Sequence, residues 1–294
     1  MITLKPAKTL TVRQMNALTA CVFEFPDILE ADAEQGAKPY DEEGYVALDQ
    51  DEAVGVLLWR VVKTSGSEDG RYLSVSLGVA PRARGRGYGS TLAGELTKIL
   101  EQHKAMPVRI DADSANKAAH HLAQKIGLHV EIKRLRYKLP LAEKRTLSQT
   151  NFRVEQYDGT DSEVAEKIAA LHGTAFRHHS PVGEFTARKI QDFSTKTRHA
   201  MLCVWDGDRL AAFAGLARHG TEGWVYWIAA GRRWWGRGAS DILSMVIINT
   251  SIDLGCTSVD AVADEKNFPS RSLMERFGMS VVSTITRYTN HVNS

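Results

Sequence analysis

The sequence is poor in cysteine and nearly balanced in charge, and both features exclude classes of protein. Three cysteines in 294 residues lie far apart and form neither a CxxC pair nor the ligand spacing of a zinc site. We expect Cys21, Cys203 and Cys256 to be small apolar side chains in a reducing compartment. The formal net charge is +2, and no basic run is long enough to form a nucleic-acid-binding face. Nucleic acid is therefore not an expected partner.

Long apolar runs are also missing. No segment approaches the ~20 apolar residues that cross a bilayer, and the residues after Met1 lack the apolar core of a signal peptide. No HExxH or comparable spacing of metal ligands occurs. These absences predict a cytoplasmic protein with no membrane partner and no bound metal. The length suits two domains of ordinary size.

The second half of the sequence repeats the first at an offset of 151 residues. Gly87 falls on Gly238, Asn116 on Asn267, and the intervening positions align without a gap. One register held over such a length indicates a duplication. We predict one domain over residues 1–142 and a second over 151–294. Six further residues in the first copy are predicted to form a surface loop within 63–70.

Both copies show the same order of elements. A short strand and helices lead to a hairpin, an apolar strand, a glycine-rich loop, a long helix, a short strand, a helix and a closing strand. The long helices are expected at 90–103 and 241–254, and the closing strands at 130–139 and 281–288. The alternation predicts an α/β or α+β unit around a mixed sheet. We expect each closing strand to complete its own copy.

The loop between the apolar strand and the long helix of the first copy carries three glycines, Gly85, Gly87 and Gly89. Glycine lets backbone N–H groups turn towards a ligand without obstruction from a Cβ atom. The helix N-terminus adds unsatisfied donors and the positive end of its dipole. Nearby positive charge comes from three arginines: Arg82, Arg84 and Arg86. These features predict a site for a pyrophosphate group.

Two common phosphate-binding motifs do not fit this loop. A P-loop requires a lysine before Ser90-Thr91, and a dinucleotide fingerprint requires glycine where Ser90 stands. The segment Arg84-Gly85-Arg86-Gly87-Tyr88-Gly89 instead resembles the acetyl-CoA loop of the GNAT acetyltransferases. In that family the pattern is Arg or Gln, two residues, Gly, one residue, then Gly or Ala. The order of elements in both copies is similar to that of the family as well.

The resemblance implies two tandem acyl-CoA N-acyltransferase domains, each a mixed, mostly antiparallel twisted sheet flanked by helices. It implies acetyl-CoA as co-substrate, with pantetheine bonded to the backbone of the central strand. The implied coenzyme contacts in the first copy are Leu77, Gly78, Val79, Arg84, Gly85, Arg86, Gly87, Tyr88, Gly89, Ser90 and Asn116. A weaker set in the second copy is Gly236, Arg237, Gly238, Ala239, Ser240 and Asn267. Trp235 replaces the motif arginine there, so we expect the first copy to bind the coenzyme more tightly.

The resemblance does not identify the catalytic groups. Many family members have a tyrosine acid where Ala123 and Met274 stand, and a glutamate base where Leu73 and Trp224 stand. Glu222 and Tyr226 are the remaining polar candidates for proton transfer in the second copy. The expected activity is direct transfer of acetyl from acetyl-CoA to a primary amine, favouring a small molecule, in a ternary complex.

The alternative is a non-catalytic acetyl-CoA-binding or sensor protein. The tandem architecture resembles that of mycothiol synthase-like two-domain acetyltransferases. We expect a monomer or a homodimer.

Overall fold

The computed structural model describes residues 2–23, 39–63, 70–104, 106–146, 151–176 and 185–290. Most of the loop predicted within 63–70 lies outside these residues. The chain divides into two compact units. Unit 1 comprises Met1–Lys63, Arg71–Lys133 and Ile285–Ser294, and unit 2 comprises Thr64–Gly70 and Arg134–Thr284. The units differ from the two sequence copies because each contains part of the other copy's closing strand.

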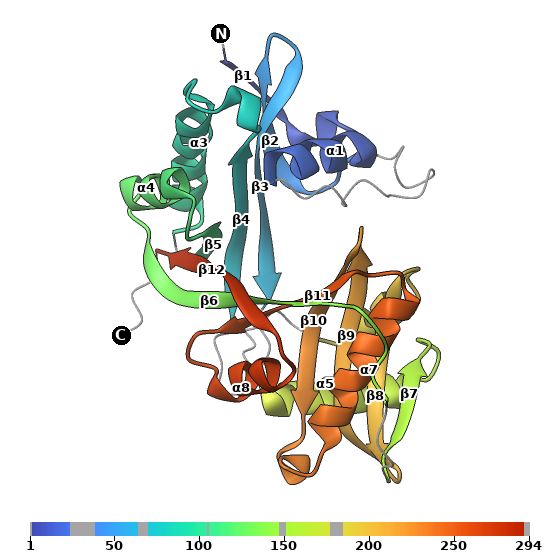
Figure 1. Cartoon of the computed structure of the whole chain (residues 1–294). Helices are drawn as coiled ribbons and strands as arrows, with labels where there is room; N and C mark the ends of the chain where they lie inside the picture. The colour runs from blue at the N-terminus through green and yellow to red at the C-terminus, as the bar shows by residue number, and fades with distance from the viewer. Residues whose placement is uncertain are drawn as a thin grey trace. The chain divides into compact units, whose positions relative to one another are not determined.

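Unit 1 is a sheet with helices on both faces (Figure 1). Its strands, in spatial order, are β1 (Ile2–Pro6), β2 (Glu43–Asp49), β3 (Glu52–Lys63), β4 (Arg71–Val79), β5 (Val108–Asp113) and the end of β12 (Ser280–Thr289). Its helices are α1 (Val12–Phe23), α3 (Tyr88–Gln102) and α4 (Lys117–Lys125). Side chains alternate across β3, so Val56 packs in the cluster of α1 while Leu57 packs in the cluster of α3.

Unit 2 has the same design. Its strands, in spatial order, are the end of β6 (His129–Pro140), β11 (Ser258–Asp264), β10 (Glu222–Ala230), β9 (Arg209–His219), β8 (His199–Asp206) and β7 (Arg153–Tyr157). Its helices are α5 (Ser162–Ala175), α6 (Ala187–Ser194), α7 (Ala239–Asp253) and α8 (Phe268–Arg276). One core cluster joins the sheet to α7, and a second joins its other face to α5 and α6.

The predicted mixed, mostly antiparallel sheet is confirmed. β4–β5 and β10–β11 are parallel pairs, and the other described pairs are antiparallel. The long helices begin at Tyr88 and Ala239, within two residues of the expected positions. Among the described residues, no helix has the length and apolarity to cross a membrane. No group of three or more potential metal ligands occurs in that part of the chain either.

The prediction that each closing strand completes its own copy is wrong. Residues 134–140 of β6, from the first copy, pair with β11 in unit 2. Residues 285–288 of β12, from the second copy, pair with β5 in unit 1. Tyr137 is thereby fully buried in the core of unit 2, and its counterpart Tyr288 is 3% exposed in unit 1. The two strands share this tyrosine but differ in apolar pattern, because Leu135 and Leu139 of β6, which pack against the core of unit 2, correspond to Thr286 and Asn290 in the second copy.

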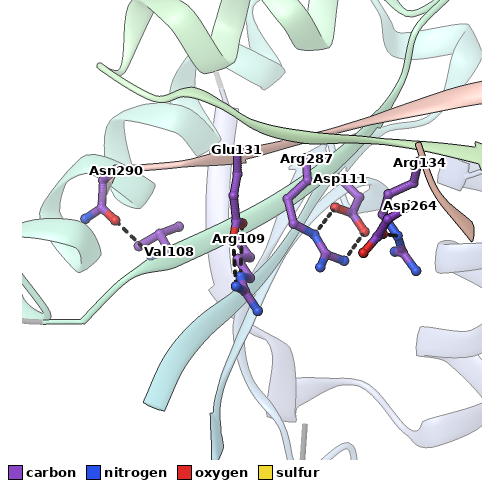
Figure 2. Close-up of polar contacts among 8 residues, drawn as sticks. All are labelled: Val108, Arg109, Asp111, Glu131, Arg134, Asp264, Arg287 and Asn290. Carbon is purple, nitrogen blue, oxygen red and sulfur yellow. Dashed lines mark hydrogen bonds and ion pairs between the residues drawn. The ribbon is translucent and has the colours of Figure 1, made fainter. Parts of the chain in front are cut away.

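Ion pairs and a side-chain hydrogen bond link the closing strands to the sheet of unit 1 (Figure 2). Arg287 donates two hydrogen bonds to the carboxylate of Asp111, at 2.7 and 2.8 Å. Arg109 makes a second bidentate pair with Glu131 at 3.0 and 2.6 Å, and both side chains are only 8% exposed. The Asn290 side chain accepts a hydrogen bond from the Val108 N–H at 2.8 Å. Bidentate pairs of this kind fix geometry as well as adding energy.

In unit 2, basic residues of β6 meet acidic residues of β11. Arg134 lies 3.2 Å from Asp264 (Figure 2). Arg136 lies 2.7 Å from Asp260, whose side chain is completely buried. Lys138 contacts Asp260 at 3.7 Å and also Glu222. A buried carboxylate needs such partners because an unpaired charge in the interior is costly.

We predict that Asp260→Asn destabilises the protein by about 2–3 kcal/mol, because it removes the completely buried carboxylate that Arg136 and Lys138 share and leaves these two partly exposed cations with Glu222 alone. Asp264→Asn is the matched control, since it removes a β11 partner of an arginine at a more exposed place. The control should cost about 1 kcal/mol or less. Urea unfolding of both variants measures the difference. Equal losses in the two variants would contradict the role given to Asp260.

A second prediction concerns His172, which is 1% exposed and lies between Phe176 and Phe185, with ring centroids 4.6 and 4.1 Å away. Burial lowers its pKa from 6.5 to about 4. The unfolded chain therefore binds a proton in a range where the folded chain does not, and stability falls as the pH drops from about 6.5 towards 4. Between pH 7 and pH 5 the loss from this group is about 2 kcal/mol.

His172→Leu should remove that part of the acid sensitivity, whereas His121→Leu, at an exposed position of α4, should not. The measurement is the free energy of unfolding of each variant at pH 7 and pH 5. An undiminished pH dependence in His172→Leu would show that this imidazole is not its source.

Candidate functional site

The two glycine-rich loops have the same backbone conformation. Gly87 and Gly238 precede α3 and α7 with φ angles of +90° and +87°, and Gly85 and Gly236 have φ of +78° and +71°. L-residues rarely adopt this left-handed region. A Cβ atom at Gly85, Gly236 or Gly238 would meet nothing within 4 Å. The conformation and the open space over the helix N-terminus, rather than crowding, therefore account for glycine at these positions.

The N-cap residues of these helices, Gly87 and Gly238, have no side chain with which to cap them. The first N–H groups of α3 and α7 are therefore donors that an anionic group can use. The side chains of Tyr88 and Ala239 are buried in their cores, so these two residues offer only backbone groups to a ligand. The side chain of Ser90 is exposed.

Arg84 and Trp235 occupy equivalent places and make equivalent bonds. The Nε atom of Arg84 donates to the carbonyl of Val79 at 3.1 Å, and the indole Nε1 of Trp235 donates to the carbonyl of Ala230 at 3.0 Å. Arg84 also reaches the Val22 carbonyl at 3.5 Å. The replacement of arginine by tryptophan therefore preserves the bond that ties the loop to its strand. The expected ranking of the two copies in coenzyme affinity stays a prediction, because these contacts provide no ground for it.

The other loop arginines of unit 1 reach neighbouring carboxylates. Arg86 lies 3.2 Å from Asp49, and Arg82 lies 2.5 Å from Glu52. These pairs join the loop to the β2–β3 hairpin. Both arginine side chains are more than half exposed, so they retain access to solvent at the edge of the loop.

In each unit the strand before the loop separates from its parallel neighbour. β4 pairs with β5 at Leu73 and Ser74, and β10 pairs with β11 from Glu222 to Val225. Beyond these pairs lie residues 77–79 of β4 and their counterparts 228–230 of β10. An extended ligand can add to a strand that has lost its neighbour. The expected pantetheine contacts are thus backbone groups beside a diverging strand.

The two strands differ in one respect. β4 pairs with β3 in a single register from Arg71 to Val79. β10 shifts register against β9 between Val225 and Trp227, so Tyr226 is an extra residue. Such a β-bulge leaves the extra residue outside the regular ladder and bends the strand. The bulge lies where β10 loses β11 as its neighbour.

A cavity of about 500 Å³ adjoins the loop of unit 2. Its walls come from five places: the end of β10, the loop, the start of α7, the last turns of α5, and α8. They include Ile228, Gly231, Trp235, Gly236, Ser240, Phe176, Asn267 and Leu273. The volume is in the usual range for a small-molecule site.

Unit 1 is packed differently at the equivalent point of its strand. A Cβ atom on Gly78 would lie 2.2 Å from a methyl group of Val22 and 3.0 Å from the ring of Phe23. Glycine is therefore required there by the close approach of α1 to β4. Its counterpart in unit 2 is Ala229.

Asn116 and Asn267 both cap helices. The Asn116 side chain accepts a hydrogen bond from the Ala119 N–H at 3.1 Å, and Asn267 accepts one from the Ser270 N–H at 3.3 Å. The caps fix the first turns of α4 and α8. Asn267 in addition lines the cavity of unit 2.

The two candidates for proton transfer differ in their surroundings. Burial tends to raise the pKa of Glu222, but its contacts with Lys138 and Arg136 outweigh that effect, and the pKa is lowered. Glu222 is therefore a paired carboxylate. Tyr226 is 50% exposed, burial of its hydroxyl raises its pKa, and its Oη lies 2.7 Å from Nε2 of His219. Sequence reasoning missed His219, the last residue of β9 before the short turn to β10.

The tryptophans of β10 have packing partners. Trp227 contacts Phe185 and Phe193, with ring centroids 4.8 and 5.0 Å away, in the core under α5 and α6. The guanidinium of Arg136 lies 4.8 Å above the ring of Trp224. Both rings are therefore held in place by unit 2 itself.

Comparison with known proteins agrees with this geometry. The curated mycothiol acetyltransferase of Streptomyces bingchenggensis (strain BCW-1) is 24% identical over 226 residues, covering 73% of this chain and 71% of its own. A tandem GNAT protein from the clavulanic acid biosynthesis pathway has the same fold, with a TM-score of 0.75, 15% identity and full coverage of both chains. A GCN5-related N-acetyltransferase from Sphaerobacter thermophilus has a TM-score of 0.69 and 17% identity, covering 98% of this chain and 95% of its own.

The profile of the Acetyltransferase (GNAT) family matches residues 13–128 and again residues 165–279. These two matches fall in the two copies and together cover more than half of the chain. The fold predicted from the glycine-rich loop and the order of elements is confirmed, as is the expectation of an N-acetyltransferase. The chain belongs to the GNAT acetyltransferase family, with two family domains in tandem.

Proposed function

We propose that unit 2 transfers acetyl from acetyl-CoA to the primary amine of a small molecule, and that unit 1 binds acetyl-CoA without turning it over. The bulge at Tyr226 beside the cavity of unit 2 is the observation that supports this division. Unit 1 lacks such a shift in the described pairing of β4 with β3. The mycothiol acetyltransferases to which the chain is similar provide the precedent for acetyl transfer.

In unit 2 the pyrophosphate would lie on the N–H groups between Gly236 and Ser240. The pantetheine would follow residues 228–230 towards the bulge. A thioester placed there would have its carbonyl oxygen beside backbone N–H groups that the bulge takes out of the ladder. Donors fixed in this way stabilise the charge that develops on the oxygen when an amine attacks. The attack forms a C–N bond and breaks the C–S bond, and coenzyme A leaves as a thiolate.

In unit 1 the pyrophosphate would lie on the equivalent groups between Gly85 and Ser90. The close packing of Val22 and Phe23 on β4 distinguishes this unit from unit 2. The regular register of β4 keeps its backbone groups in the ladder with β3. We therefore assign binding to this unit and chemistry to the other.

Binding in unit 1 is tested by Gly87→Asp. An aspartate there puts a carboxylate where the phosphate must approach, and it should weaken acetyl-CoA binding at one site by tenfold or more. Gly127→Asp is the control for backbone strain, because Gly127 has φ of +79° and open space around it, in the same unit. Calorimetric titration with acetyl-CoA measures both. Unchanged binding in Gly87→Asp would exclude this loop as a coenzyme site.

Turnover in unit 2 is tested by Gly238→Asp. Release of thiol from acetyl-CoA, measured against a panel of amino sugars, diamines and amino acids, should fall at least tenfold. Gly278→Asp is the control, with φ of +85° and no atom closer than 3.9 Å to the new Cβ. Gly87→Asp should retain turnover. If Gly87→Asp abolished thiol release while Gly238→Asp did not, the chemistry would belong to unit 1.

A further inference from the structure

A histidine and a tyrosine meet beside the bulge of β10. His219 ends β9 and faces Glu222 across the turn, while Tyr226 lies four residues further along β10. Despite this separation, the Tyr226 hydroxyl lies 2.7 Å from Nε2 of His219. The two side chains therefore lean towards each other along the sheet, and the Tyr226 hydroxyl is within hydrogen-bonding distance of Nε2 of His219.

Aromatic neighbours hold this pair in position. The ring of Tyr226 contacts Phe193 of α6 and Trp227, with centroids 5.9 and 5.6 Å away. Phe193 is itself buried in the second core cluster of unit 2. Tyr226 is nevertheless 50% exposed, so it lies between a rigid core and solvent. A half-exposed hydroxyl can be solvated by water, and stability alone does not require the histidine.

The position of the pair relative to the cavity suggests a chemical role. Cavity-lining residues of β10 begin at Ile228, two residues beyond Tyr226, which is about 7 Å of extended chain. Tyr226 leans to the face of the sheet covered by α6, whereas Ile228 packs in the cluster of α7. An acceptor amine that approaches the thioester from the α6 face would therefore meet the tyrosine hydroxyl.

We propose that Tyr226 and His219 together accept the proton of the attacking amine, which rests on acetyl transfer taking place in unit 2. As the amine nitrogen bonds to the acetyl carbon and the C–S bond breaks, the nitrogen gives its proton to the Tyr226 oxygen. Tyr226 passes its own proton to Nε2 of His219, with the other imidazole proton on Nδ1. The products are the amide, the coenzyme A thiolate and a protonated His219, which then releases its proton to solvent or to the thiolate.

The titratable and charged groups near the pair are His199, Lys196 and Glu222. His199 of β8 is buried, and desolvation with the nearby charge of Lys196 lowers its pKa to about 4. Glu222 forms ion pairs with Lys138 and Arg136. A histidine ordinarily changes its charge near pH 6.5, which suits a proton acceptor at neutral pH.

The test compares His219→Gln, Tyr226→Phe and the double variant with the parent chain. The probe is acetyl-CoA with the amine of the panel that gives the fastest thiol release in the parent. Each single variant should lower kcat by about 100-fold. The double variant should be no slower than the slower single variant, because the two groups act as one unit. The rise of kcat with pH around neutrality should disappear in His219→Gln.

His121→Gln, in α4 of unit 1, is the control and should match the parent. Calorimetry should show acetyl-CoA binding unchanged in every variant, and thermal unfolding should show the fold intact. A parent that turns over while His219→Gln keeps both its kcat and its pH profile would overturn the role of the pair. A parent that neither binds acetyl-CoA nor releases thiol would overturn the proposed function itself.

Discussion

Pairing of charged side chains between β6 and β11, and between β12 and β5, is the constraint on which both units depend. The 151-residue repeat shows why each closing strand joins the other copy. If β6 took the place of β12 on β5, Lys138 would stand where Thr289 stands, next to the buried guanidinium of Arg109. Asp260 would in turn lose a cationic neighbour. Two like charges in the interior and a weakened buried carboxylate both oppose that arrangement. The apolar pattern opposes it as well, because Leu135 and Leu139, which pack against the core of unit 2, would be replaced by Thr286 and Asn290.

The choice of closing strand also affects the candidate site of unit 2, because β11 connects the two. That strand lies between β6, which comes from the first copy, and β10, which carries the bulge. Its pairing with β10 ends at Ala261 opposite Val225, and the cavity lies beyond this end. Tyr137 of β6 fills the core against which α8 packs, and α8 supplies part of the cavity wall. A family domain encoded by the second copy therefore has part of its cavity wall supported by a strand encoded by the first.

The sequence predicted the local features well because they depend on local chemistry. The glycines of both loops, the order of elements and the helix starts follow from backbone freedom and apolar spacing, which neighbouring residues decide. The strand exchange could not be predicted in this way, since it is a choice between distant partners. The role of Trp235 was missed because a motif records residue types, whereas the loop requires only a donor that reaches one carbonyl. The bulge could not be predicted from a motif either, because it is a shift in the pairing of β10 with β9 at Tyr226, and no residue pattern marks it.

Duplication allows the two units to differ while their loops stay alike. Gly87 and Gly238 have nearly the same backbone angles, so both loops keep a backbone conformation that suits an anionic ligand. The strands that precede the two loops have diverged: β4 is regular and covered closely at Gly78, while β10 is bulged and adjoins a cavity. Binding a coenzyme requires the first feature, but catalysis also requires groups that stabilise the transition state more than the bound substrate. In our proposal, the bulged backbone with Tyr226 and His219 beside it provides such groups in unit 2. The observed difference between the two units therefore lies in strand geometry rather than in the loop motif.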